Sequence, residues 1–313
     1  MIKLTGIQRK VLTEISMDSR SPVSVVARKL NLREHVVRNT IRFLADKLGL
    51  EPYCFTDPSR QGLLSFRIYF CLRSGDTGRI KKMLSHLSAL PQTTWLFSLY
   101  GYYHFGWAIR ASSISMLEQL LAELDKTFGN LIQKRSIGII ARYVHFVPWL
   151  AHSGKGPRKG FEFTLSDFPT RIDDVDRTLI TLIRKAPSAS IVEWSRMLGL
   201  PSSTVSYRFD KLLENGVLIA FFYNYETRVI GTECFLILVA LYGFGGTAHD
   251  QIIEFARNHP RATWAARIMG EWHVEIEVAL DDPHELHRII EQIHEVGQGQ
   301  VREVITHAWG QDL

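Results

Sequence analysis

The sequence predicts an α+β fold made of two copies of one plan: a winged helix-turn-helix domain followed by a ferredoxin-like βαββαβ domain. The first observation behind this is an internal repeat, because a shift of 168 residues places ARKLNL (27–32) on SRMLGL (195–200). The second is that a shift of 169 places TTWLFSLYGYYH (93–104) on ATWAARIMGEWH (262–273). Similarity at a fixed period indicates a duplicated unit.

The duplication divides the chain into five predicted segments. Their boundaries are 1–60 for winged helix-turn-helix 1, 61–149 for ferredoxin-like domain 1, 150–169 for a linker, 170–228 for winged helix-turn-helix 2 and 229–313 for ferredoxin-like domain 2. The linker is rich in Gly, Pro and Lys and has little periodicity, which is typical of a connecting segment.

Three helices are predicted at the start of each repeat. In the second repeat they cover 172–186, 189–198 and a third stretch, PSSTVSYRFDKLLENGVL (201–218), that follows a Gly199-Leu200 turn. We expect Ser202 or Ser203 to cap the third helix, with Pro201 in its first turn. Apolar residues spaced i, i+4 and i+7 should anchor this helix to a core, and they are Val205, Phe209 and Leu212. Extended stretches at 53–58 and 218–226 then provide candidate wings.

The remainder of each repeat reads strand, helix, strand, strand, helix, strand. In the second repeat the strands are predicted at 232–242, 262–269, 272–280 and 301–309, and the helices at 248–259 and 283–296. Alternation is clearest in HVEIEVAL, where Val274, Ile276 and Val278 should face the core and Glu275 and Glu277 the other side. This element order is that of a ferredoxin-like unit.

Composition narrows the class of protein. No 18-residue apolar run and no signal-peptide pattern appear at the start of the sequence, so we expect no membrane partner and a cytoplasmic location. The three cysteines are far apart, which argues against disulfides and cysteine-based zinc sites. His284, His287, Glu291 and His294 share one helix face, and we expect a solvated face there, with a metal site as the alternative. No metal or other cofactor is therefore predicted.

Charge and motif together favour double-stranded DNA as a partner. Residues 1–60 carry a net charge of +5 and residues 61–147 carry +6, whereas residues 221–313 carry −8. In a helix-turn-helix the third helix lies in the major groove and its first turns reach base edges. The candidate DNA-binding residues are Arg33, His35, Arg38, Asn39 and Arg42 in repeat one, and Ser202, Ser203, Thr204, Ser206, Tyr207, Arg208 and Lys211 in repeat two. The alternative is a capped amphipathic helix without a partner.

A family likeness emerges from these residues. IDDVDRTLITLI followed by WSRMLGLPSSTVSYRFDKLLENGVL resembles the DNA-binding domain of the Lrp/AsnC (feast/famine) transcriptional regulators. The matching positions are Asp173, Asp176, Arg177, Leu200, Ser203, Thr204, Val205, Arg208, Leu212, Gly216 and Val217. The resemblance implies a sequence-specific regulator whose βαββαβ domains serve assembly and effector binding, with self-association as an internal pseudo-dimer of the repeats and as a homodimer or higher. Each repeat resembles one family member, so the resemblance covers nearly the whole chain. The match of the DNA-binding domain is looser in repeat one.

Two departures from the family pattern concern the effector domain. Family members commonly carry Gly-x-x-Asp between the second and third strands, but the sequence reads GYYH (101–104) and GEWH (270–273). The candidate effector-binding residues are therefore Gly101, His104, Gly270 and His273. A ligand pocket at these histidines and a pair of strand-edge histidines kept from the duplicated ancestor are both open readings.

An enzyme is the main alternative to a regulator. Sirohaem decarboxylases resemble this chain in pairing a helix-turn-helix-like domain with the same βαββαβ domain, some as tandem fusions. In such an enzyme His104 or His273 would transfer protons, and Arg110 or Arg267 would hold substrate carboxylates. A scaffold that does not bind DNA is the third reading. Since no P-loop, GxGxxG or GxSxG motif occurs, we predict no catalytic residues and no enzyme activity.

Overall fold

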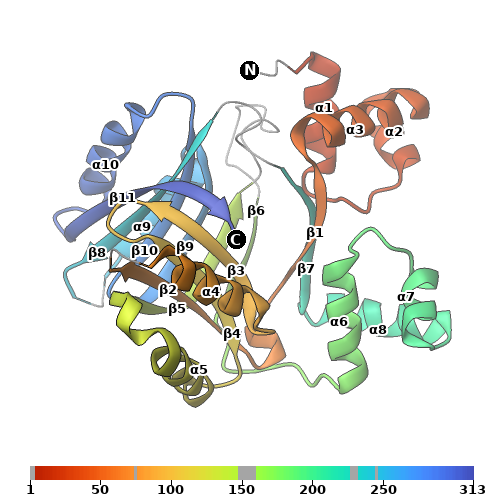
Figure 1. Cartoon of the computed structure of the whole chain (residues 1–313). Helices are drawn as coiled ribbons and strands as arrows, with labels where there is room; N and C mark the ends of the chain where they lie inside the picture. Colours follow the sequence, from red (N-terminus) through yellow and green to blue (C-terminus); the bar gives the residue numbers. More distant parts are fainter. Residues whose placement is uncertain (1–3, 74–75, 147–159, 226–231, 244–245) are drawn as a thin grey trace. The chain divides into compact units, whose positions relative to one another are not determined.

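The structure, a computed structural model, describes residues 4–73, 76–146, 160–225, 232–243 and 246–313 (Figure 1). The chain forms two compact units. The first comprises residues 1–61, 145–162 and 168–232, and it holds both three-helix segments. The second comprises residues 62–144, 163–167 and 233–313, and it holds both βαββαβ segments. Like parts of the two repeats are thus gathered together.

The first unit contains two three-helix sets at the predicted places. Its elements are α1 (Gly6–Ile15), α2 (Val23–Leu30), α3 (Glu34–Leu48), β1 (Glu51–Thr56), the short 3₁₀ helix η1 (Ser59–Gln61), α6 (Asp174–Lys185), α7 (Ile191–Leu198), α8 (Ser202–Glu214) and β7 (Leu218–Asn224). Both sets begin with a capping box, made by Thr5 and Gln8 in α1 and by Asp173 and Asp176 in α6. Each box satisfies backbone N–H groups that a helix start leaves free.

The extended stretches after the third helices pair with each other across the repeats. β1 and β7 form an antiparallel two-stranded sheet in which Tyr53 lies opposite Phe222. As a result each helical core receives a residue from the other repeat. Tyr225 joins the core of the first three-helix set, and Cys54 joins the core of the second. The two predicted wings are therefore shared between the repeats.

The second unit contains the βαββαβ order twice, as predicted. Repeat one supplies β2 (Leu64–Leu72), α4 (Thr77–Ala89), β3 (Thr93–Tyr100), β4 (Phe105–Ala111), α5 (Ile114–Phe128), η2 (Gly129–Leu131) and β5 (Ile132–Phe146). Repeat two supplies β8 (Glu233–Leu241), α9 (Ala248–Asn258), β9 (Ala262–Gly270), β10 (Val274–Leu280), α10 (Glu285–Val296) and β11 (Val301–Asp312). A further strand, β6 (Gly160–Thr164), lies in the predicted linker 150–169, whose residues 150–159 are outside the described part of the chain.

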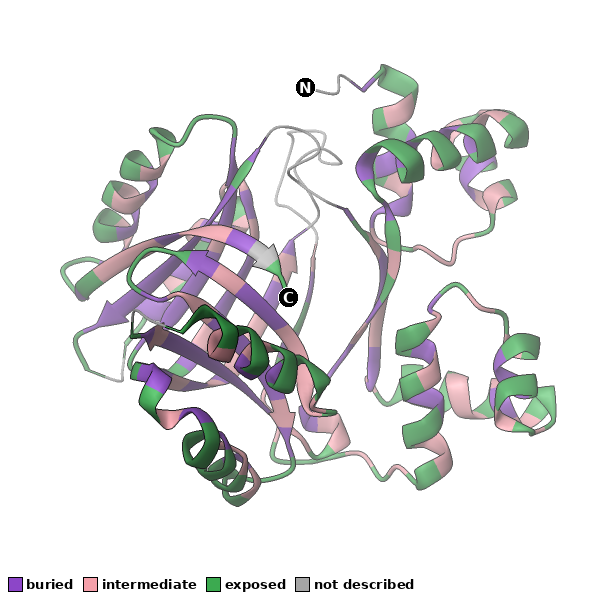
Figure 2. Ribbon diagram, viewed as in Figure 1, coloured by how far each residue is buried: buried purple, intermediate pink, exposed green. Residues whose placement is uncertain are grey.

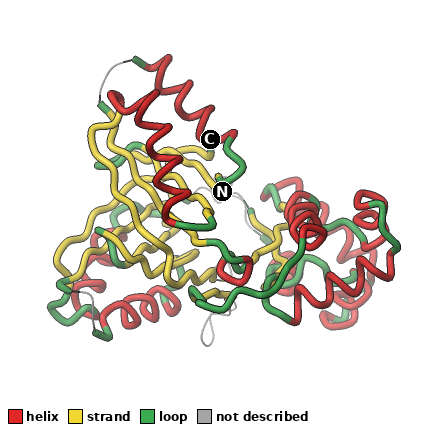
Figure 3. The backbone as a smooth tube through the Cα atoms, turned by 90° about the horizontal axis from the view of Figure 1, so that it is seen from below, coloured by secondary structure: helices red, strands yellow, loops and turns green. Residues whose placement is uncertain are grey.

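The strands of the second unit close into a ring. The sheet order is β2-β4-β3-β11-β8-β10-β9-β5-β6, and β2 also pairs with β5. The last strand of each repeat therefore lies beside the second strand of the other, at the junctions β3–β11 and β9–β5. A closed ring leaves fewer strand edges exposed than two separate four-stranded sheets would. In Figure 3 the helices lie outside these strands.

Closure of the ring buries both faces of β2, β8 and β10, which are largely purple in Figure 2. On β2, Phe66, Ile68 and Phe70 pack in one apolar cluster with Met83 of α4 and Leu117 of α5. The alternate residues of β2 face the interior of the ring. The sequence placed the two glutamates of β10 on the side away from the helices, and that side is also enclosed.

The structure gives one result for membranes. Within the described residues, none of the helices combines the length and hydrophobicity that crossing a bilayer requires.

Candidate nucleic-acid interface

The start of α8 differs from the capping that the sequence predicts. The N-cap is Pro201, which makes no side-chain cap, so the prediction that Ser202 or Ser203 caps the helix is wrong. Ser202 is already the first helical residue, and its hydroxyl donates to Ser195 Oγ over 3.2 Å. Since proline lacks an N–H and fixes φ near −65°, it starts the helix without a polar cap. The helix ends at Glu214 with Asn215 as its C-cap, and Gly216 follows with φ +67°.

The side chains of α8 divide into an anchored face and an outer face. Val205 and Leu212 are buried and Phe209 packs beside them, as predicted. On the outer face Ser203 and Lys211 are exposed, and Tyr207 is 64% exposed. Thr204 and Ser206 are partly exposed. This face offers hydroxyl donors and acceptors together with one exposed cation.

Arg208 has partners within its own domain. Its guanidinium lies 2.8 Å from an Asp173 carboxylate oxygen and 2.7 Å from Asp176 Oδ1, which joins α8 to the capping box of α6. The backbone N–H of Asp176 and the Arg208 guanidinium lower the pKa of Asp173. Arg208 was predicted to contact DNA. Its place in the structure gives it a contact between helices, and a DNA contact for this side chain stays a prediction.

The third helix of repeat one, α3, presents exposed arginines. Arg33 is the N-cap of α3 and is exposed, and His35, Arg38, Asn39 and Arg42 are exposed along the helix. Arg38 lies 3.8 Å from Glu34, an ion pair between two exposed side chains. Such pairs contribute little free energy, so Arg38 is readily available to another anion. Val37 and Leu44 are buried beneath this face.

Arg20 joins the two three-helix sets and was not among the residues predicted from the sequence. It follows α1, and its Nη1 donates to the backbone oxygens of Pro187 (2.7 Å) and Ala189 (2.9 Å) just before α7. Its guanidinium also lies over the rings of Trp194 at 4.7 Å and Phe221 at 5.2 Å. A planar cation suits this combination of carbonyl and ring contacts. With the β1–β7 pair, Arg20 fixes the two sets to each other within the first unit.

The four predicted effector residues have structural contacts that follow the repeat. His104 Nδ1 accepts the backbone N–H of Leu72 at 2.9 Å, and His273 Nδ1 accepts that of Leu241 at 3.0 Å. A Cβ atom at Gly101 or Gly270 would lie within 3 Å of atoms in the opposing strand. These contacts favour the reading of retained structural residues. Effector binding by them stays a prediction.

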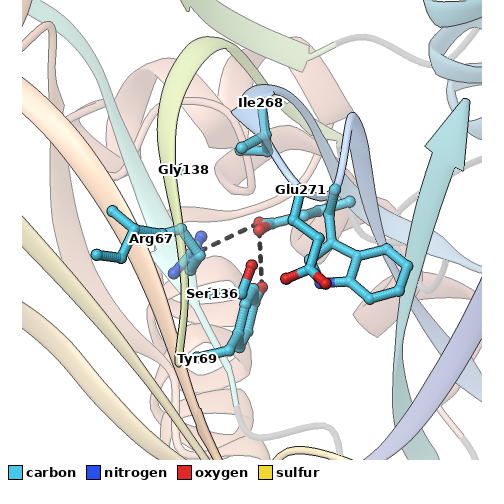
Figure 4. A pocket seen from close by; sticks show the side chains of 9 residues that line it. Arg67, Tyr69, Ser136, Gly138, Ile268 and Glu271 are labelled. Carbon is cyan, nitrogen blue, oxygen red and sulfur yellow. Dashed lines mark hydrogen bonds and ion pairs between the residues drawn. The ribbon is translucent and has the colours of Figure 1, made fainter. Parts of the chain in front are cut away.

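Polar residues inside the strand ring, which were not predicted from the sequence, contact one another. Arg67 Nε donates to Glu275 Oε2 at 3.1 Å, and the Tyr69 hydroxyl donates to Glu275 Oε1 at 2.8 Å (Figure 4). Burial raises the pKa of Glu275, and Arg67 and Tyr69 oppose that effect. Beside them is a cavity with about 10 Å³ available to the centre of a water-sized sphere, about the room for one water molecule. In the described part of the chain, no group of three or more His, Cys, Asp or Glu residues is arranged to hold a metal ion.

Comparison with known proteins agrees with the geometry of the first unit. A family model for winged helix-turn-helix DNA-binding domains matches residues 172–219, which contain α6, α7 and α8. An uncharacterized HTH-type transcriptional regulator of Pyrococcus abyssi is 30% identical over 139 residues, which cover 92% of that protein and 43% of this chain. The chain belongs to the HTH-type transcriptional regulators.

A second relative and one solved structure are also similar to this DNA-binding regulator. An uncharacterized HTH-type transcriptional regulator of Pyrococcus horikoshii is 29% identical over 142 residues, covering 94% of that protein and 44% of this chain. These relatives thus correspond to less than half of the present regulator. The crystal structure of the siroheme decarboxylase NirDL matches with a TM-score of 0.62 over 97% of this chain and 91% of that chain. At 12% identity that match concerns the fold alone.

Proposed function

We propose that this regulator recognises a specific duplex DNA sequence with two recognition helices, α3 and α8, in successive major grooves. The observation that carries the proposal is the joint presentation of two such helices by one compact unit. The outer face of α3 offers Arg33, Arg38 and Arg42 to phosphates or guanines. The outer face of α8 offers hydroxyl groups, Tyr207 and Lys211. Because the two faces differ chemically, the two half-sites should differ in sequence.

The second unit enters the proposal as the assembly part of the regulator. We propose that the two repeats of one chain pair with each other, as two separate chains do in the Lrp/AsnC regulators that this chain resembles. We also propose that copies of the chain associate further. The strand junctions β3–β11 and β9–β5 support this arrangement. The five-segment division, the cytoplasmic location and a small effector near Gly101, His104, Gly270 and His273 belong to the same proposal.

A salt-titrated gel shift on the DNA upstream of the protein's own gene tests the proposed function. Wild type should bind with an affinity that falls steeply with salt, because each neutralised phosphate releases counterions. Arg38→Ala and the Ser203→Ala/Thr204→Ala double variant should each weaken binding. Lys126→Ala, which removes an exposed cation from α5, is the matched control and should bind like wild type. If neither this duplex nor random duplex is retained at low salt, the proposal fails.

A second candidate is a siroheme-decarboxylase-like enzyme, favoured by the whole-chain likeness to NirDL. The described cavity beside Arg67 has room for about one water molecule, far less than a tetrapyrrole needs. Titration of an iron tetrapyrrole into the protein decides between the two. Our proposal of a non-catalytic regulator expects no saturable absorbance change, and a shifted, saturable spectrum would favour the enzyme.

A further inference from the structure

The two junctions of the strand ring are built alike. A Cβ atom at Gly101 would lie 2.9 Å from His307 Cδ2 and 3.1 Å from the Thr306 oxygen. A Cβ atom at Gly270 would lie 2.7 Å from the Ile137 oxygen and 2.9 Å from Gly138 Cα. All three pairs of corresponding residues differ by 169 in number. Each repeat therefore places its glycine turn on the last strand of the other repeat in the same way, and residues can be compared position by position.

Buried charges break this equivalence. Arg67 of β2 is 3% exposed and Glu275 of β10 is 0% exposed, and they form an ion pair across the repeats. Tyr69, also buried, donates to the same carboxylate. Arg67 further lies over the rings of Trp95 and Trp264, one from each repeat, at 5.7 and 5.5 Å. The three polar groups come from both repeats, and Arg67 and Tyr69 reach the Glu275 carboxylate only in a mixed pair.

The corresponding positions hold no charges. A shift of 169 takes Arg67 to Leu236, Tyr69 to Leu238 and Glu275 to Gly106. A pair of two first repeats would therefore place Arg67 opposite Gly106, and a pair of two second repeats would place Glu275 opposite Leu236. Each such pair would bury two charges without partners, which is strongly destabilising.

The size of the side chain also differs at corresponding positions of the two repeats. Gly106 lies directly under the ring of Phe97, since a Cβ atom there would lie 2.1 Å from Phe97 Cζ. The counterpart of Phe97 in repeat two is Ala266. At the junctions, the His307 imidazole of repeat two corresponds to Gly138 of repeat one, and the small cavity lies beside Gly138. Large groups of one repeat thus correspond to small groups of the other.

We propose that the inner sheet surface of each repeat is specific for the other repeat, so that repeat one pairs with repeat two and not with repeat one of another copy. Arg67, Tyr69 and Glu275 are the residues that set this choice. The proposal does not depend on DNA binding, and its test needs no DNA.

Disulfide crosslinking between two introduced cysteines in the full chain shows which repeats are paired. Tyr100 and Ala308 are opposite residues of β3 and β11, so Tyr100→Cys/Ala308→Cys detects mixed pairing. The counterpart of Ala308 is Ile139, so Tyr100→Cys/Ile139→Cys detects pairing of two first repeats. Both pairs are introduced into a chain with Cys54, Cys71 and Cys234 replaced by serine. The protein is unfolded in urea, refolded at high concentration and oxidised. The first pair should crosslink fully, and the second should give no crosslinked dimer.

Variants of the three polar residues then test the cause. In the apolar triple variant Arg67→Met/Tyr69→Phe/Glu275→Leu, the Tyr100→Cys/Ile139→Cys pair should begin to crosslink between chains. Arg67→Glu should abolish the mixed crosslink, and Arg67→Glu/Glu275→Arg should restore it, which keeps the proposal testable if the triple variant does not fold. Crosslinked first repeats in the otherwise wild-type chain would overturn the proposal. So would a mixed crosslink that Arg67→Glu leaves unchanged.

Discussion

The two three-helix sets share a plan but use their charges differently. In repeat two, Arg208 of α8 binds the two carboxylates that cap α6. The corresponding residues of repeat one are Thr40, Thr5 and Gln8, none of which is charged. In that repeat Arg33, Arg38 and Arg42 are exposed at the start and on the outer face of α3. If both third helices bind DNA as proposed, α3 would rely on charge and α8 on hydroxyl groups. A similar divergence separates Gly138 from His307 in the second unit.

Removal of the α3 arginines should have the largest effect on DNA binding. The variant Arg33→Ala/Arg38→Ala/Arg42→Ala should lose about 1–3 kcal/mol for each base contact and reduce the salt slope by about 0.9 for each phosphate contact. Ser203→Ala/Thr204→Ala should lower the preference for specific over random duplex and leave the salt slope nearly unchanged. Binding isotherms at several salt concentrations measure both quantities. Equal salt slopes for the two variants would contradict the division of roles between α3 and α8.

The next largest effect concerns acid stability at His307. Burial lowers the pKa of this imidazole to about 4. Between pH 6.5 and 4 the unfolded chain therefore binds more protons, and the free energy of unfolding should fall by up to about 3 kcal/mol as the pH decreases through this window. His307→Gln, whose side chain also accepts the Tyr103 N–H, should reduce this fall. Urea unfolding at a series of pH values measures it.

The matched control for His307 is His294→Gln, which alters an exposed histidine of α10. It should keep the pH dependence of wild type. If His307→Gln and His294→Gln behave alike, burial of the His307 imidazole is not what weakens the fold in acid.

Loss of Arg20 should make the distance between the two proposed recognition helices, α3 and α8, more variable. Arg20→Ala removes two carbonyl contacts and the ring contacts in repeat two, about 1–2 kcal/mol in all. Wild type should prefer one spacing between half-sites, and the variant should tolerate added base pairs better. Gel shifts on operators of graded spacing measure this preference, with Lys10→Ala as an exposed-cation control. An unchanged spacing preference would mean that the β1–β7 pair alone holds the helices.

The smallest effect is expected at Arg208. Arg208→Met should lower stability by about 1 kcal/mol or less, because the ion pairs lie near the surface. It should also change the response to acid. Asp173 has a lowered pKa in the folded chain, so its contribution is present above the unfolded value and is lost as the pH falls through the folded one. Thermal melts from pH 5 to 2 should show a smaller acid loss in Arg208→Met than in Lys211→Met.

The sequence predicted the elements well because their signals are local and occur twice. The helices at 248–259 and 283–296 and the four strands of repeat two agree with α9, α10, β8, β9, β10 and β11 to within a few residues. Burial of Val205 and Leu212 followed from helical spacing alone. Because the pattern is duplicated, each element is predicted independently from both repeats, and agreement between the two predictions supports the assignment.

Long-range partners could not be predicted in the same way. Arg67 and Glu275 are 208 positions apart, and alternation on β10 reveals two faces but not what covers the second. One signal was available: both charges interrupt apolar runs, in LSFRIYF and HVEIEVAL. A charge inside a buried strand needs a partner, and searching for the partner would have suggested the ring. Arg20 carried no such signal, because a cation in a polar loop is ordinary.

The exchange of residues between the helical cores has a consequence for synthesis on the ribosome. The core that contains Val37 and Leu44 also contains Tyr225, which is made about 180 residues later. At a translation rate of roughly 5–20 residues per second, Tyr225 is synthesised on the order of ten seconds or more after the first three-helix set. During that interval the first three-helix set lacks both β7 and the residues of the second set that Arg20 contacts. The core of the first three-helix set is therefore completed only after translation has passed β7 of the second repeat.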